Sequence, residues 1–426
     1  MPTRAIGFWT AVALVMGNMI GSGVFLLPAS LAPFGGMAFG GWLLSAGGAM
    51  ALALVFARLA AASPAAGGIY AFSRAAFGDL AGFLVAWGYW TAVWVGCAAL
   101  AIAFVGYLDP FAPVIARTPA LAAITAIAAV WLLTGVNLWS VRSAGAVQVV
   151  TTALKVLPLI VIGIAGLTVL NPAHFAMPAR ASGVGGTIST LMAAATLTMW
   201  ALMGLETATI PADQVEAPER TIPRATVTGT GLAALIYIVS AAGVMGVLAP
   251  ETLAHTTAPF ADAARRFFGD AGALVVAAGG VVSCFGALNG WLLIQGQLPV
   301  PVAKDGLFPA AFGRLSARGT PVLPLILGSV LASLLIAANA SRGLVSLFTL
   351  LIQLSTLSTL VPYVFCSLAA FVRGERSVAG VIALLFSMFA IAGAGAEVVY
   401  YGFLLLLGGL PVFVWVRRGR AGALAR

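Results

Sequence analysis

Charged residues are scarce in this chain of 426 residues. They make up 8% of the sequence, whereas 62% is hydrophobic, and the mean hydropathy is +1.08. A soluble domain carries about 25% charged residues. The composition therefore excludes a water-soluble globule and a disordered chain, and it predicts a polytopic membrane protein. At about 20 apolar residues per span, a chain of this length holds roughly 11 to 13 helices.

Residues that hold metals or carry out catalysis are also rare. There are two histidines, predicted to lie in loops, and three cysteines, all in apolar segments and without CxxC spacing. With no HExxH motif, no histidine–cysteine cluster and no P-loop, we expect no metal site, no cofactor and no enzyme activity. The net charge of +9 is not arranged in basic runs interleaved with aromatic residues, so we expect no nucleic-acid partner.

Long apolar stretches predict twelve membrane-spanning helices. Their approximate bounds are 7–31, 37–61, 79–108, 119–138, 145–170, 187–211, 225–248, 271–298, 321–339, 344–371, 377–394 and 398–416. If the N-terminus is cytoplasmic, fifteen basic residues flank the cytoplasmic ends and five the outer ends, while Lys155 lies inside a span. This bias follows the positive-inside rule. It predicts a multi-pass protein of the bacterial inner membrane, surrounded by lipid, with both termini in the cytoplasm.

Two of these spans carry residues that disfavour a continuous helix. The first contains Gly17, Asn18, Gly21 and Gly23 within seven residues, and the sixth contains Gly204 followed by Glu206. Irregular backbone survives inside a membrane only where protein buries it or where it lines a cavity. Matching interruptions five spans apart indicate a transporter built from two inverted repeats. The alternative is that the glycines only allow close helix packing.

Short motifs spread along the chain resemble one known family, the amino acid–polyamine–organocation superfamily. Within it, the chain is most similar to the basic amino acid/polyamine antiporters of bacteria, and in particular to the arginine/agmatine antiporters. The resemblance covers nearly the whole chain from about residue 7. It depends on these motifs: Gly17-Asn18-Met19-Ile20-Gly21-Ser22-Gly23, Gly67-Gly68-Ile69-Tyr70, Tyr89-Trp90, Trp200 with Gly204-Leu205-Glu206, Pro218-Glu219-Arg220-Thr221-Ile222-Pro223, Gly290-Trp291, Asp305-Gly306-Leu307-Phe308-Pro309 and Leu360-Val361-Pro362-Tyr363.

The resemblance implies an all-α, LeuT-like fold in one transmembrane domain, residues 1–426. Residues 7–170 would form the first inverted repeat, 187–371 the second, and 377–416 two further helices. The implied function is sodium-independent exchange of amino acids or their decarboxylated amines by alternating access. Proton-coupled or exchange transport of small neutral amino acids is the alternative. A homodimer is also compatible with the resemblance.

Both the residues and the resemblance place the substrate at the two interrupted spans. Backbone N–H groups of Gly21, Ser22 and Gly23 begin a half-helix and would bind a carboxylate. Carbonyl groups near Ile20, Trp200 and Met203 would accept hydrogen bonds from an ammonium group. Asn18 belongs to the same motif.

Aromatic residues would complete the site. Trp291 is the predicted platform for a cationic side chain, because an indole face attracts cations. By resemblance, Trp200 and Tyr89 would gate the outer side and Tyr363 the inner side. Taken singly, each aromatic residue is as well explained by packing or by anchoring at the membrane interface.

Some pocket positions match the arginine/agmatine pattern and others depart from it. Ala92 and Ser355 match. In the family pocket, an asparagine and a cysteine occupy the positions of Cys97 and Val93, and a serine occupies the position of Ala201. A guanidinium has five donors and would find fewer partners here. The departures favour a smaller cation or a neutral amino acid over arginine.

Three titratable residues are the coupling candidates. A carboxylate inside a span, such as Glu206, must face a cavity, pair or become protonated; by resemblance it serves proton-sensitive gating, and Tyr70 matches an acid-sensing tyrosine. Lys155 would replace a sodium ion of sodium-coupled relatives or carry a proton. The alternatives are that Glu206 only stabilises its helix through hydrogen bonds to nearby hydroxyl groups, and that the Lys155 side chain extends to the membrane interface.

Overall fold

The computed structural model describes residues 7–62, 68–139, 144–207 and 215–424. These residues form helices joined by short turns, and no β-strand occurs among them. The α-helices are α1 Phe8–Met19, α2 Ser22–Leu31, α3 Met37–Ala62, α4 Ile69–Phe77, α5 Asp79–Gly106, α6 Pro113–Arg117, α7 Pro119–Trp139, α8 Ala144–Thr168, α9 Gly183–Leu202, α10 Pro218–Val247, α11 Pro250–Leu253, α12 Pro259–Gln297, α13 Pro299–Lys304, α14 Val322–Ala338, α15 Leu344–Val372, α16 Val378–Gly393, α17 Ala396–Leu407 and α18 Gly409–Leu424.

Within the described residues, eight helices are long and apolar enough to cross a membrane. A ninth span results if α1 and the helix that follows it, bent by 42° at their junction, count as one. Three shorter apolar helices, Lys155–Thr168, Val322–Ala338 and Val378–Gly393, lie where further spans are predicted. The protein is therefore an all-helical, polytopic membrane protein, whereas the total of twelve spans and the inverted repeats stay predictions.

The eighth predicted span, 271–298, corresponds to the second of two helical segments within α12. Gly269, with φ 63° and ψ −164°, is not helical and separates residues 259–268 from residues 270–297. The charged segment before Gly269 was predicted to lie outside the membrane. In the structure, Arg265 pairs with Asp262 at 2.7 Å and with Asp270 at 2.9 Å, so the charges neutralise one another on a helical segment.

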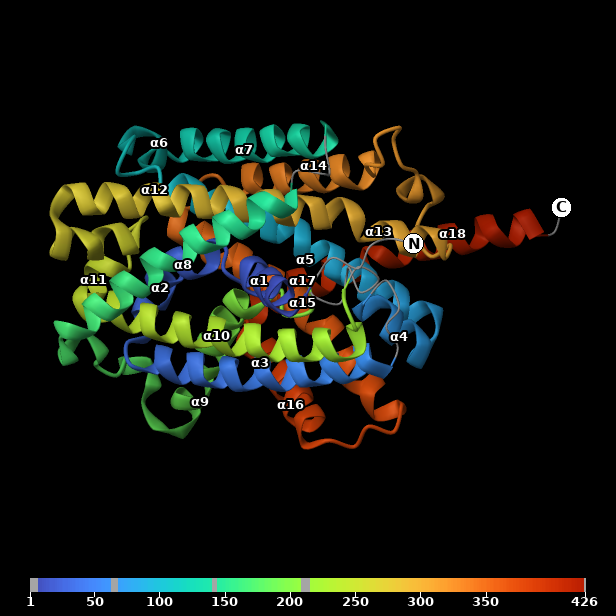
Figure 1. The fold of residues 1–426 in the computed structure, drawn as a ribbon, viewed down its shortest axis with the longest axis horizontal. Helices are drawn as coiled ribbons and strands as arrows, with labels where there is room; N and C mark the ends of the chain where they lie inside the picture. The colour runs from blue at the N-terminus through green and yellow to red at the C-terminus, as the bar shows by residue number, and fades with distance from the viewer. Residues whose placement is uncertain (1–6, 63–67, 140–143, 208–214, 425–426) are drawn as a thin grey trace.

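Helix α5 lies at the centre of the bundle and contacts α2, α4, α7, α12, α14 and α15 (Figure 1). Almost all of its apolar stretch is buried. Because lipid tails are as apolar as leucine, packing rather than the hydrophobic effect holds such helices together. Glycine permits the close approach: at Gly82 of α5 a Cβ would lie 2.7 Å from the Cβ of Arg74 in α4.

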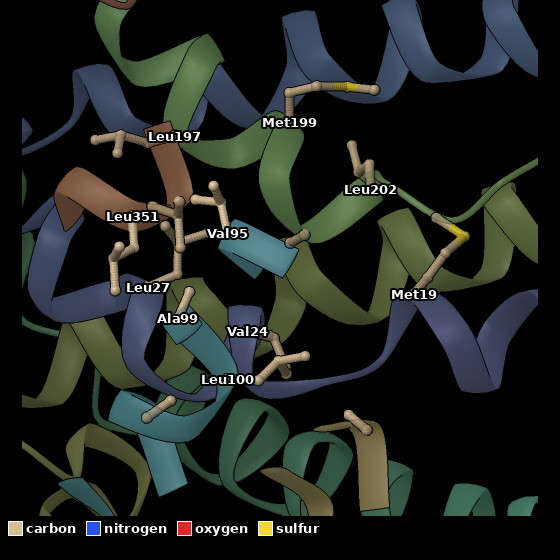
Figure 2. Packing of buried hydrophobic residues seen from close by; sticks show 14 of the residues in the cluster. Met19, Val24, Leu27, Val95, Ala99, Leu100, Leu197, Met199, Leu202 and Leu351 are labelled. Carbon is tan, nitrogen blue, oxygen red and sulfur yellow. The ribbon is translucent and has the colours of Figure 1, made fainter. Parts of the chain in front are cut away.

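Interlocking aliphatic side chains join the elements that surround the centre of the molecule. Figure 2 shows Val24 and Leu27 of α2, Val95 and Leu100 of α5, and Leu351 of α15 packed together. All five side chains are at most 2% exposed. This packing fixes α2 against α5 and α15, and so positions the backbone where α1 ends.

Candidate functional site

The first helical interruption lies where the glycine-rich motif predicted it. Helix α1 ends at Met19 and α2 begins at Ser22, while Ile20 (ψ 81°) and Gly21 (φ −113°, ψ −145°) are not helical. The first N–H groups of α2 therefore have no partner within their own helix. They form a site suited to an anion.

The second interruption lies at the end of α9. This helix ends at Leu202, nine residues before the predicted end of the span at 211, and Met203 is extended. Gly204 has a φ of +102°, a conformation that side chains other than glycine rarely adopt. A Cβ on Gly204 would lie 3.4 Å from the Asn18 carbonyl carbon, so the two interruptions face each other.

A small cavity of about 20 Å³ lies beside the two interruptions. Most of the predicted site residues line it: Asn18, Gly21, Gly23, Tyr89, Ala92, Val93, Trp200, Ala201, Met203, Trp291 and Ser355. Its volume is room for about one water molecule, so the site must open to admit a substrate. Ile20 and Cys97 are fully buried but do not line this cavity, and the side chain of Ser22 lies outside the described residues.

Four residues that line the cavity were not predicted from the sequence: Met19, Gly96, Leu100 and Thr359. Helical spacing could have found three of them. Gly96 and Leu100 follow Tyr89, Ala92 and Val93 at the three- and four-residue spacing that keeps residues on one helix face. Thr359 lies one turn after Ser355 on α15 and could have been found in the same way.

Trp200 is held between two glycines on different helices. A Cβ on Gly23 of α2 would lie 2.8 Å from its indole, and a Cβ on Gly96 of α5 would lie 3.0 Å from its far edge. Real Cβ contacts are not that short, so both positions need glycine for the indole to lie there. Trp200 therefore covers one side of the cavity while contacting α2 and α5.

Glu206 accepts hydrogen bonds from two buried phenols. The Tyr363 hydroxyl donates to Oε2 at 2.6 Å, and the Tyr89 hydroxyl donates to Oε1. Tyr89 and Tyr363 were expected at opposite ends of the site. The structure brings them together, because the turn after α9 places the carboxylate between α5 and α15. Tyr89 also lines the cavity, so it links the cavity to the carboxylate.

Lys155 is buried in α8, with 1% of its surface exposed. Its ammonium group has no hydrogen-bond partner among the described residues. Cys284 of α12 lies close enough to interact electrostatically with the ammonium group. The hydroxyl of Ser283, which precedes Cys284 in the chain, also has no described hydrogen-bond partner. The ammonium group does not reach the protein surface, so the structure does not favour the interface interpretation.

Tyr70 belongs to a cluster of polar side chains that links α4 and the start of α5 to the turn after α13. Its hydroxyl donates to Asp305 at 2.8 Å, and Arg74 pairs with Asp305 at 2.7 Å and with Asp79 at 3.0 Å. These contacts join α4, the start of α5 and the turn after α13. Burial, and then the bond to Asp305, raise the pKa of Tyr70 well above its ordinary value near 10.

The raised pKa predicts how Tyr70→Phe will behave. A group whose pKa rises on folding contributes stability that is fully present below its unfolded pKa and is lost only as pH rises beyond that value. Tyr70→Phe should therefore lower the melting temperature by a constant amount between about pH 5 and pH 8. Thermal unfolding in detergent across this range measures the difference. A difference that changed with pH would show that Tyr70 itself titrates there.

The comparisons with known proteins agree with this architecture. A family model described as amino acid permease matches residues 6–411, which is nearly the whole chain. The chain belongs to the amino acid permease family. The resemblance to the amino acid–polyamine–organocation superfamily is thus confirmed.

Individual relatives of this permease match it over nearly their whole length. It is 34% identical to the cadaverine/lysine antiporter of Escherichia coli (strain K12), over 92% of this chain and 90% of the relative. It is 30% identical to the putrescine transporter PotE of Haemophilus influenzae, over 97% of both. A Bacillus subtilis (strain 168) protein, provisionally named an arginine/ornithine antiporter, is 33% identical over 97% of both.

These relatives are transporters and antiporters rather than enzymes, and they are bacterial. Together with the apolar helices, they make the permease a multi-pass protein of the inner membrane. The orientation of its termini stays a prediction. The expected homodimer has no support in the comparisons.

Proposed function

We propose that this permease exchanges a cationic amino acid for a diamine across the inner membrane by alternating access, without sodium. The observation that carries the proposal is the cavity between the two facing helix interruptions, bordered by Trp200 and Trp291. The N–H groups at the start of α2 suit a carboxylate. The indoles suit an ammonium group. Relatives named for lysine, cadaverine and putrescine support this substrate class.

Transport of small neutral amino acids is the second candidate, and the lining of the cavity favours it. Val93, Ala201 and Leu100 are apolar, and no acidic side chain lines the cavity among the described residues. The nearest support for a cationic cargo is Glu206, which reaches the cavity through Tyr89. A cation would therefore be held by indole faces and backbone carbonyls rather than by a direct ion pair.

Counterflow in proteoliposomes separates these functions. Vesicles loaded with unlabelled lysine should accumulate labelled cadaverine or lysine in sodium-free buffer, whereas empty vesicles should not. Equal uptake into empty vesicles would rule out exchange. Accumulation of labelled alanine but not of lysine or cadaverine would favour the neutral-substrate function.

The arrangement of aromatic residues suggests the two gates. We assign Trp200 to the outer side, because it covers the cavity between Gly23 and Gly96. We assign Tyr89, Glu206 and Tyr363 to the inner side as one hydrogen-bonded unit. This revises the predicted pairing of Tyr89 with Trp200. Opening the inner side would require the two phenols to leave the shared carboxylate.

Lys155 is the proposed substitute for a bound sodium ion. It provides one positive charge on α8 close to Cys284 of α12. Helix α8 also packs against α1, whose end forms the first interruption. A permanent positive charge at this place would make sodium unnecessary.

Trp291→Leu tests whether the cargo is a cation. A cation over an indole gains about 0.5–2 kcal/mol, so the variant should lose roughly 2- to 30-fold in affinity for lysine and cadaverine. Its affinity for alanine should change much less. Binding isotherms in detergent measure both ligands.

A matched variant separates the charge effect from shape. Trp291→Phe keeps an aromatic face and should recover part of the lost affinity for the cations. If Trp291→Leu weakened alanine and lysine equally, Trp291 would act by shape alone.

A further inference from the structure

Three helix ends meet at a groove that is separate from the central cavity. The start of α1, the last turns of α3 and the first turns of α10 surround a groove of about 530 Å³. Helices α3 and α10 run side by side along most of their length (Figure 1). The groove therefore opens at the end of the bundle where α1 begins, which is the predicted cytoplasmic face.

Two arginines border this groove without an acidic partner among the described residues. Arg58 of α3 and Arg224 of α10 are exposed. Neither forms an ion pair with a carboxylate in the described part of the chain, although Glu219 borders the same groove. The Arg224 guanidinium lies 5.4 Å from the ring centre of Phe8, which keeps it directed toward the start of α1.

The remaining wall of the groove is apolar and lies at the depth of the membrane interface. Leu54, Ala57 and Val227 line it, and Trp9, beside Phe8 at the start of α1, is 72% exposed. Exposed tryptophans at helix ends mark the level of the lipid headgroups. Guanidinium groups at that level next to apolar helix surfaces match a ligand with a phosphate and acyl chains.

We propose that this groove binds the headgroup of an anionic phospholipid, with Arg58 and Arg224 holding its phosphate. The acyl chains lie along the exposed apolar surfaces next to the groove. A bound lipid contacts α1, α3 and α10 at once. It therefore stabilises the position of α1, the helix that ends at the substrate cavity.

Thermal unfolding with defined lipids tests the proposal. The protein in detergent is mixed with phosphatidylglycerol or with phosphatidylcholine of the same acyl chains. Phosphatidylglycerol should raise the melting temperature by about 3 °C or more relative to phosphatidylcholine, since a ligand stabilises the state that binds it. In the double variant Arg58→Gln/Arg224→Gln this difference should disappear. The melting temperature in phosphatidylcholine should stay unchanged, because both side chains are exposed.

Two controls make the result specific. Arg373→Gln/Arg376→Gln removes two exposed arginines from the connection between α15 and α16 and should keep the full effect of phosphatidylglycerol. Inorganic phosphate at the same concentration should not reproduce the effect. The proposal is wrong if the wild type does not distinguish the two lipids, if both double variants lose the effect equally, or if phosphate alone replaces the lipid. If the double variant fails to fold, the single variants Arg58→Gln and Arg224→Gln decide by the same comparison.

Discussion

Lys155→Met is expected to abolish most transport while making the protein more stable. An unpartnered ammonium group inside the protein costs free energy, and the Lys155 ammonium has no described hydrogen-bond partner. Methionine fills a similar volume without the charge, so the melting temperature should rise. Exchange should fall by about 10-fold or more, equivalent to about 1.4 kcal/mol, because the positive charge proposed to replace a sodium ion is lost.

The measurements are counterflow rates and thermal unfolding of the same preparation. Leu159→Ala is the matched control, because Leu159 lies one turn further along α8 and is fully buried. It should lose about 2–5 kcal/mol of stability through the cavity it leaves, while retaining sodium-independent exchange. If Lys155→Met exchanged substrate at the wild-type rate without sodium, the charge of Lys155 would have no part in transport.

We expect exchange to change with pH on the acidic side through Glu206, and Glu206→Gln should remove this acidic limb of the pH–rate profile and slow exchange. The carboxylate accepts a hydrogen bond on each oxygen, from Tyr89 and from Tyr363. Glutamine keeps one acceptor oxygen and presents an NH₂ group to the other phenol. A hydrogen bond to a charged group contributes about 1.5–3 kcal/mol, so a loss of about 10-fold or more in rate is expected. A glutamine cannot change its charge, and the profile should become flat on the acidic side.

Tyr363→Phe provides the comparison for this variant. It removes one donor but keeps the titrating carboxylate, so its rate should fall while its acidic limb remains. Counterflow between about pH 5 and pH 8 measures both variants. An acidic limb that persisted in Glu206→Gln would assign the pH dependence to another group.

Much of the architecture could be predicted from the sequence, because it depends on local chemistry. A run of 20 apolar residues specifies a span wherever it folds. Gly21 and Gly204 weaken the helix at their own positions, and the structure interrupts both spans there. Residues such as Ala92 and Val93 share one face of α5 through helical periodicity alone. The motifs that resemble the family also contain Gly21 and Gly204.

The grouping of residues far apart in the chain was decided only by the tertiary structure. Tyr89 and Tyr363 are 117 and 157 residues from Glu206, and no local pattern states that they share its carboxylate. The Trp200 indole lies between Gly23 and Gly96 because three helices pack around it. The sequence shows a lysine inside an apolar span, but only the packing of α8 against α12 leaves the Lys155 ammonium buried and without a described partner. Such contacts depend on how helices pack against one another, whereas the sequence pattern reports what each helix is made of.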